Sequence, residues 1–250
     1  MFNVFHHYTR GRGHELEGTP CQDRTQYLSC NGVQAICLAD GAGSASQAEL
    51  GAQAVVEEGC ALLVERFSEL LASADAERTR IELLERLLSK LRQLATQHRI
   101  APDDLASTFL GVAVAGDHFL GVHIGDGVIG YVKDDELRVV SAPRNSEFVN
   151  QTTFLTSQNA AQSMLLFRGS LDGVGGFILM SDGAGESLFD ARSGQFAPAC
   201  SKIIATVGAG VPRRNGNFKF RTQLQKLIDL RVRSATKDDC SIAVLGRTVP

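Results

Sequence analysis

The stretch QAICLADGAGS, residues 34–44, indicates the fold most directly. Its short apolar run predicts a buried strand, and Asp40 follows at once, at the start of a loop of glycine, alanine and serine. Beyond this loop, apolar residues recur every three or four positions over residues 52–71, which predicts an amphipathic helix. We expect Ser44 or Ser46 to cap that helix, because a short hydroxyl can accept a hydrogen bond from the amides of the first turn.

Strands and helices come in blocks on both sides of this stretch. We predict strands, then a helix pair, then an antiparallel meander, then further strands, a second helix pair and a last strand, at residues 2–9, 27–28, 34–38, 52–71, 81–95, 108–140, 164–167, 176–180, 201–207, 221–233 and 241–246. Within the meander, Asp134-Asp135 reads as a hairpin turn. Because the blocks do not alternate strictly, the order disfavours a parallel doubly wound sheet and favours antiparallel sheets with helices outside.

The bulk composition is that of an ordinary globular protein. The chain has 250 residues without a compositional break, so we interpret residues 1–250 as a single domain. Its net charge of −3 argues against a nucleic-acid partner. No apolar run approaches the roughly 20 residues that a membrane span needs. The six cysteines form no CxxC pair and follow no leader-like segment, so we expect reduced thiols in a cytoplasmic protein without a membrane anchor.

Aspartates follow the predicted strands at four places. They are Asp40, Asp126, Asp182 and the pair Asp238-Asp239, and glycine comes directly after the first three. A single Asp-Gly after a strand is most often a turn. Four such places suggest instead a shared acidic site, where glycine permits a sharp turn and close backbone approach. Gathered carboxylates repel one another, so the site would need a hard divalent cation such as Mg²⁺ or Mn²⁺. Two such ions can activate a water for attack on a phosphate ester.

Six pieces of the chain carry a resemblance to a known family. They are PCQDR (20–24), ADGAGS (39–44), STFLGVAV (107–114), VHIGDGVIGYV (122–132), LMSDGAG (179–185) and KDDCSIAVL (237–245). In this order and spacing the chain resembles the metal-dependent type 2C protein Ser/Thr phosphatases, the PPM family, and more closely a divergent bacterial branch of it. The resemblance implies an α+β fold: a four-layer αββα sandwich of two packed antiparallel sheets flanked by antiparallel helix pairs.

The resemblance also implies roles for the acidic residues. Asp40 would bridge two Mn²⁺ or Mg²⁺ ions, with the Gly41 carbonyl on one of them. Asp182 and Asp238 would complete the shell of the second ion, and Asp126 would join Asp182 at a possible third.

Two further assignments depend on the motifs at either end of the chain. Asp23, in PCQDR, would bind metal-coordinated water, so that Asp23, Asp40 and Asp182 are the expected catalytic residues. Asp238-Asp239 stands where the family has Asp-Asn, which makes Asp238 the expected ligand and leaves Asp239 as the alternative.

The chain departs from the family pattern at three places. Gly18 occupies the position of an arginine that binds substrate phosphate, and Arg10, Arg12 or His14 could substitute, with His14 favoured. A structural loop histidine is the alternative interpretation of His14. Ala42 replaces a histidine that acts as general acid in some members. The segment between residues 140 and 164 is short, so we expect the flap that shapes substrate choice in some bacterial members to be reduced or missing.

The function implied by the resemblance is hydrolysis of phosphoserine and phosphothreonine in proteins by a metal-activated water. Expected partners are a phosphorylated protein and a companion Ser/Thr kinase, and we expect a monomer. The missing arginine keeps open a catalytically weak module that binds phosphoproteins. A phosphatase of a small phosphorylated metabolite is the third interpretation.

Overall fold

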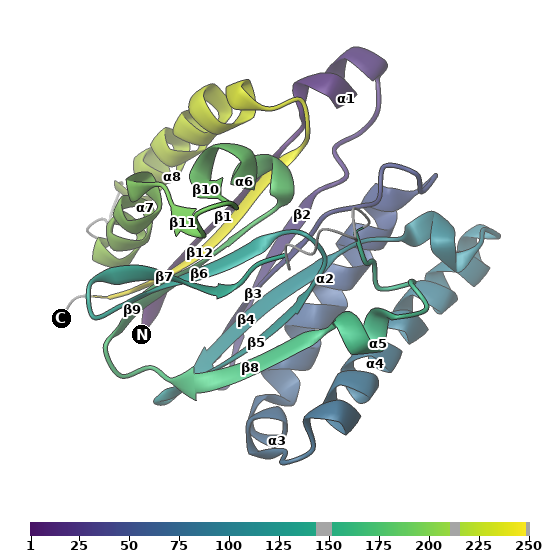
Figure 1. The fold of residues 1–250 in the computed structure, drawn as a ribbon, viewed down its shortest axis with the longest axis horizontal. Coiled ribbons are helices and arrows are strands. Elements are labelled where there is room, and N and C mark those ends of the chain that lie inside the picture. Colours follow the sequence, from purple (N-terminus) through teal and green to yellow (C-terminus); the bar gives the residue numbers. More distant parts are fainter. Residues whose placement is uncertain (144–151, 211–215, 249–250) are drawn as a thin grey trace.

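The computed structural model describes residues 1–143, 152–210 and 216–248 (Figure 1). Two five-stranded sheets pack face to face, and helices cover the outer face of each sheet. The predicted α+β sandwich of four layers is confirmed. None of the helices in these residues is long and apolar enough to cross a membrane.

Neighbouring strands are antiparallel in both sheets. Sheet A has the order β1 (Phe2–Thr9), β12 (Cys240–Arg247), β9 (Val174–Met180), β6 (Val128–Lys133) and β7 (Glu136–Ser141). Sheet B has the order β2 (Arg24–Cys30), β3 (Val33–Ala39), β4 (Phe109–Ala115), β5 (His118–Ile124) and β8 (Leu165–Ser170). A small hairpin joins β10 (Phe189–Asp190) and β11 (Gln195–Phe196).

The remaining elements are helical. They are α1 (Arg12–Glu17), α2 (Ala48–Glu65), α3 (Phe67–Ala72), α4 (Ala76–His98), η1 (Pro102–Leu105), α5 (Ala160–Ser163), α6 (Asp182–Leu188), α7 (Pro198–Ala209), α8 (Gly216–Leu227), η2 (Ile228–Val232) and η3 (Arg233–Ala235).

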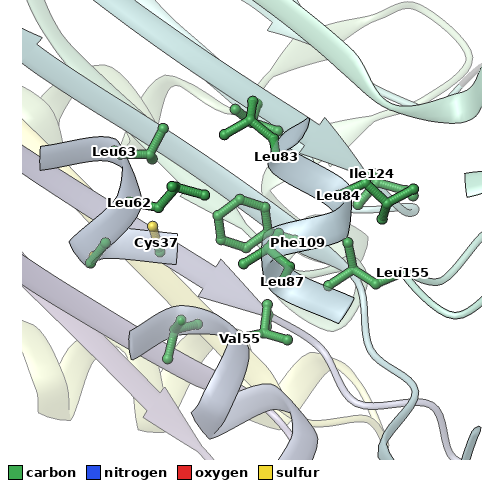
Figure 2. Close-up of a cluster of buried hydrophobic side chains, with 14 of the residues drawn as sticks. Cys37, Val55, Leu62, Leu63, Leu83, Leu84, Leu87, Phe109, Ile124 and Leu155 are labelled. Atoms are coloured by element: carbon green, nitrogen blue, oxygen red, sulfur yellow. The ribbon is translucent and has the colours of Figure 1, made fainter. Parts of the chain in front are cut away.

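Helices α2 and α4 cover sheet B because each has a wide apolar face. Figure 2 shows leucines of both helices around Phe109 and Cys37 of the sheet. Asp75 begins α4 by accepting a hydrogen bond from the backbone N–H of Arg78 at 2.9 Å, which satisfies an amide that the helix leaves free. The predicted helix pair is therefore present at this face.

Helices α7 and α8 cover sheet A in the same way. Ile204 of α7 and Leu224 of α8 belong to one buried cluster with Ile178 and Ile242 of the sheet. A third cluster fills the space between the sheets, where the rings of Phe119 and Phe177 lie 5.0 Å apart. The two sheets thus share a core, and their strand ends are held in fixed relation to each other.

Two predictions about the first helix are wrong. The run from residue 52 to 71 forms two helices, α2 and α3, which meet at Arg66. Neither serine caps α2: Gln47 occupies the capping position, and the Ser46 hydroxyl donates instead to Asp104 Oδ1 at 2.8 Å.

The predicted meander over residues 108–140 is divided between the sheets. β4 and β5 belong to sheet B, whereas β6 and β7 belong to sheet A. The chain crosses from one sheet to the other at residues 125–127, which places Asp126 between them. The expected turn at Asp134-Asp135 is confirmed, since both residues have positive φ, 51° and 64°.

Candidate metal centre

Three of the predicted aspartates converge where the two sheets meet. Asp40 follows β3 of sheet B, Asp126 lies on the crossing between the sheets, and Asp182 follows β9 of sheet A. One carboxylate oxygen from each lies within 4.8 Å of the others. Because a divalent cation with oxygen ligands needs converging carboxylates, this arrangement suits Mg²⁺ or Mn²⁺.

The loop that contains Asp40 is held in place by Ser107 and Thr108, which directly precede β4. Asp40 N donates to Thr108 Oγ1 at 2.9 Å, and Thr108 N donates to Asp40 O at 2.8 Å. Gly41 forms a β-bridge with Ser107. A Cβ at Gly41 would lie 2.9 Å from the carbonyl oxygen of Ala48, so the loop depends on the absence of a side chain there.

Asp182 begins α6, and its Oδ1 accepts a hydrogen bond from Gly183 N at 2.6 Å. A Cβ on Gly183 would lie 2.2 Å from the carbonyl oxygen of Asp239. Glycine therefore lets the start of α6 approach the segment before β12. The expected close approach of backbone to backbone is confirmed at Gly183, which lies against Asp239. The expected sharp turn is not seen there, because Gly183 does not have a positive φ.

Asp238 and Asp239 have different surroundings. Both oxygens of buried Asp239 are engaged: Oδ1 accepts from Gly11 N and Oδ2 from Gln22 N, each at 2.6 Å. Among the described residues, Asp238 Oδ1 accepts a hydrogen bond from Asp239 N, at 2.8 Å. Burial raises the pKa of Asp182, and the negative charge of Asp238 adds to this effect. Asp238 is outside the group of three, but it is more exposed than the buried Asp239. The contacts favour Asp238 as the ligand.

Asp23 is fully buried, and neither of its carboxylate oxygens accepts a well-aligned hydrogen bond from the described residues. Burial raises its pKa, and the smaller effect of the nearby hydroxyls of Ser181 and Ser241 lowers it. A buried carboxylate without well-aligned donors is costly, so this side chain fits a role as acceptor for ordered water or for a cation's hydration shell.

The acidic residues destabilise one another's charged forms. Burial raises the pKa of Asp40 well above its ordinary value, and the charges of Asp23 and Asp182 act in the same direction. Burial also raises the pKa of Asp182 to about 6, helped by the charge of Asp126, and that of Asp23 to about 7. A bound cation would remove this repulsion, because it stabilises the ionised carboxylates. The residues present therefore fit divalent metal ions.

His14 lies beside the site but is oriented toward Asp239. His14 Nδ1 lies 3.0 Å from Asp239 Oδ2, although the two groups are not aligned as a hydrogen bond. His14 belongs to α1, which ends at Gly18 with a left-handed φ of 75°. That backbone disfavours an arginine, so the geometry gives a reason for the glycine at this position.

The two arginines considered as substitutes are bound to backbone carbonyls. Arg10 Nη1 donates to Thr19 O at 3.4 Å, and Arg12 Nε donates to Thr236 O at 3.1 Å. Their contacts hold the ends of α1 in place. Of the three candidates, His14 has the most direct contact with the acidic segment, and its role toward phosphate stays a prediction.

Two residues beside the site were not predicted from the sequence. Thr108 stood in one of the matching pieces, directly before a strand, and could have been considered as a partner of Asp40. Thr152, whose hydroxyl donates to Asp126 Oδ2, carries no recognisable motif. Of the segment where we expect the flap to be reduced or missing, residues 144–151 lie outside the described residues, and the rest contains the short helix α5.

A pocket of about 530 Å³ opens beside Asp126 and Asp182. Beyond these carboxylates its walls come from β6, β7, α6 and the β10–β11 hairpin, and they include Val128, Val139 and Phe189. It was not predicted, because its walls come together only when the hairpin packs beside sheet A.

Comparison with known proteins places the chain in a family. A model of the protein phosphatase 2C family matches residues 10–227. Serine/threonine-protein phosphatase 3 of Escherichia coli strain K12 is 31% identical over 167 residues. The chain spans 64% of the length of that relative, and the alignment covers 64% of the chain itself.

Solved structures with low sequence identity share the fold. A bacterial serine phosphatase has a TM-score of 0.66 at 14% identity, with 100% of this chain and 99% of that one covered. The catalytic domain of the serine/threonine protein phosphatase PstP, in complex with two manganese ions, has a TM-score of 0.63 at 18% identity, with 99% of each chain covered. The family model matches most of the chain and spans Asp40, Asp126 and Asp182, so the chain belongs to the protein phosphatase 2C family.

Proposed function

We propose that this chain hydrolyses phosphoserine and phosphothreonine in proteins, using two Mn²⁺ or Mg²⁺ ions and a water molecule. The convergence of Asp40, Asp126 and Asp182 carries the proposal. The name of the Escherichia coli relative and the manganese ions bound by PstP support it. Such ions, when bound, would lower the pKa of a water and withdraw charge from the phosphate oxygens.

Each residue of the site would have a separate task. Asp40 would bridge the two ions, with the Gly41 carbonyl as a ligand of one of them, and Asp182 and Asp238 would complete the ligands of the second ion. Asp126, with Asp182, would hold a third ion. Asp23 would accept hydrogen bonds from water and orient it, since neither of its oxygens accepts a well-aligned hydrogen bond from the described residues. His14 would contact the substrate phosphate.

The substrate would be a phosphorylated protein, and the family suggests a companion Ser/Thr kinase that makes it. We expect the chain to act as a monomer in the cytoplasm, which size-exclusion chromatography and fractionation would check.

A metal-titrated phosphatase assay tests the proposed function. Wild type should hydrolyse p-nitrophenyl phosphate and a phosphothreonine peptide with Mn²⁺ or Mg²⁺, and Asp182→Asn should lose activity at least about a hundredfold. Asp172→Asn is a matched control, because Asp172 is exposed and remote from the pocket and the acidic group. Full activity in excess chelator would contradict the proposal.

A second candidate is a weakly catalytic module that binds phosphoproteins. Gly18, which stands where an arginine would hold phosphate, is the observation in its favour. Tight binding of a phosphopeptide without turnover at saturating metal would support this candidate. A panel of small phosphorylated metabolites in the same assay would test the third interpretation.

A further inference from the structure

The pocket beside Asp126 and Asp182 changes character along its length. At the metal end it is lined by these two carboxylates and by Ser181. Farther away its walls are largely apolar, formed by Val128, Val139, Ala142, Pro143, Phe189 and Ala191. No lysine, arginine or histidine is among the lining residues that the structure describes. The pocket is therefore continuous with the candidate metal centre but chemically distinct from it.

The outer wall of the pocket is formed by the β10–β11 hairpin, which packs firmly against sheet A. Phe189 and Phe196 pair across the β10–β11 hairpin, with ring centroids 4.9 Å apart. β11 lies against β7, and Phe196 occupies the space above Gly130 of β6. The hairpin is thus anchored to sheet A by aromatic packing, which fixes Phe189 and Ala191 at the pocket. A wall held in this way can select the shape of a ligand.

We propose that this pocket binds a bulky apolar side chain, such as leucine, that lies close in sequence to the phosphorylated residue of the substrate. The inference rests on the proposed function, because it takes the phosphate to be held at the metal end. An extended peptide advances about 3.3–3.6 Å per residue, so a residue one to three positions away would reach the apolar walls. A volume of about 530 Å³ lies in the usual range for ligand pockets, about 300–1,000 Å³.

The charge of the pocket favours an apolar occupant over an acidic one. Glu186 is the carboxylate at the α6 wall, and it would repel an acidic side chain. A basic side chain could reach Glu186 but would leave the valines and Phe189 without an apolar partner. Burial of apolar surface is the larger contribution that these walls can make to binding.

Peptides that differ at one position test the proposal. Leucine is moved through the three positions on each side of phosphothreonine in an otherwise alanine and glycine peptide, and kcat/KM is measured at saturating Mn²⁺. At one or two adjacent positions, leucine should raise kcat/KM over alanine by about tenfold, the usual effect of a few methylenes in an apolar pocket. No preference at any position, or a preference for lysine over leucine, would overturn the proposal.

Two variants connect the preference to the pocket. Val139→Asp places a charge on a wall residue that is 37% exposed, and Ala191→Trp fills part of the space. In both, the ratio of kcat/KM for the leucine and alanine peptides should fall toward one. The ratio is measured within one variant, so a general loss of folding or metal does not alter it. Leu230→Asp is the control, because Leu230 is 71% exposed and outside the pocket, and it should keep the wild-type ratio. A wild-type ratio in both pocket variants would overturn the proposal.

Binding measurements separate this inference from the proposed function. If wild type shows no turnover of any phosphopeptide with metal, the proposed function fails. The same peptides, carrying a fluorophore, then report Kd by anisotropy. Tighter binding of the leucine peptide that is lost in both pocket variants would still support the pocket assignment, and equal Kd values for leucine and alanine would reject it.

Discussion

At the scale of single residues, Asp40 should weaken the folded protein when no metal is bound. Its carboxylate is half-buried beside those of Asp23 and Asp182, and both neighbours have raised pKa values. A folded protein that binds protons more tightly than its unfolded chain loses stability as pH rises. For Asp182 the loss occurs between pH 3.8, the ordinary pKa, and its folded pKa of about 6. For Asp23 it extends from pH 3.8 to a folded pKa of about 7.

We therefore predict that Asp40→Asn raises the free energy of unfolding in chelator at pH 8, by about 1 kcal/mol or more. The same variant should lose both activity and the stabilisation by Mn²⁺. Urea unfolding with and without metal measures these effects, with Asp172→Asn as the control. A variant less stable than wild type in chelator would show that the carboxylate has a structural partner.

Asp238 and Asp239 should respond differently to the same substitution. Asp239→Asn puts an amide group where two backbone N–H groups need acceptors, so it should cost about 1–3 kcal/mol of stability. Asp238→Asn should leave the metal-free protein at least as stable, because burial already raises the pKa of that residue. Asp238→Asn should instead weaken metal binding, which calorimetry measures. The reverse pattern would make Asp239 the ligand.

At the scale of elements, much of the fold was predictable from local patterns. The bounds of β1 agree with the predicted strand at residues 2–9, and both helix pairs occur where apolar spacing indicated them. The sequence did not show that β5 and β6 belong to different sheets. Their apolar runs look alike, and sheet membership depends on the long-range pairing of β6 with β9.

The residues of the candidate site were largely predictable from the sequence, but their long-range contacts were not. The pattern of an aspartate directly after a predicted strand identified Asp40, Asp126 and Asp182, and the fold brings these three residues together. Adjacent Asp238 and Asp239 could not be separated, because only contacts from residues far away in the chain distinguish them. The contact of His14 with Asp239 likewise depends on the placement of α1 beside the start of β12.

His123 of β5 connects the two sheets next to the crossing at Asp126. Its Nδ1 lies 2.5 Å from Ser141 Oγ at the end of β7, and burial lowers the pKa of His123 from 6.5 to about 4. The unfolded chain binds this proton more tightly, so His123 should cost stability as pH falls from 6.5 toward 4.

We predict that His123→Asn reduces this loss of stability by up to about 3 kcal/mol, from about 1.4 kcal/mol per pKa unit. Urea unfolding of wild type and variant at pH 7 and pH 4.5, in chelator, gives the difference in slope. Ser141→Ala keeps the titrating ring and should retain the wild-type slope. Parallel profiles for wild type and His123→Asn would contradict the prediction.

At the scale of the whole molecule, the candidate metal centre joins two sheets. Asp40 comes from sheet B, and Asp182 and Asp238 come from sheet A. Bound ions would therefore stabilise the contact between the sheets as well as the loops, since ligands that bind only the folded state add to its stability.

We predict that Mn²⁺ slows backbone hydrogen exchange at the ends of both β3 and β9. Hydrogen–deuterium exchange with mass spectrometry, with and without chelator, measures this protection. Asp40→Asn should remove the protection in both sheets together. Protection confined to one sheet would show that the ions do not connect them.

The position of β12 has a consequence for synthesis on the ribosome. This strand lies between β1 and β9, although β1 is made first and β12 last among the strands described. Sheet B needs no strand beyond β8, so it can assemble on the nascent chain, while β1 must wait for a partner more than two hundred residues away. Asp238 directly precedes that late strand. A nascent chain would therefore acquire its complete set of metal ligands only when translation has passed β12, and the unfinished protein would stay inactive until then.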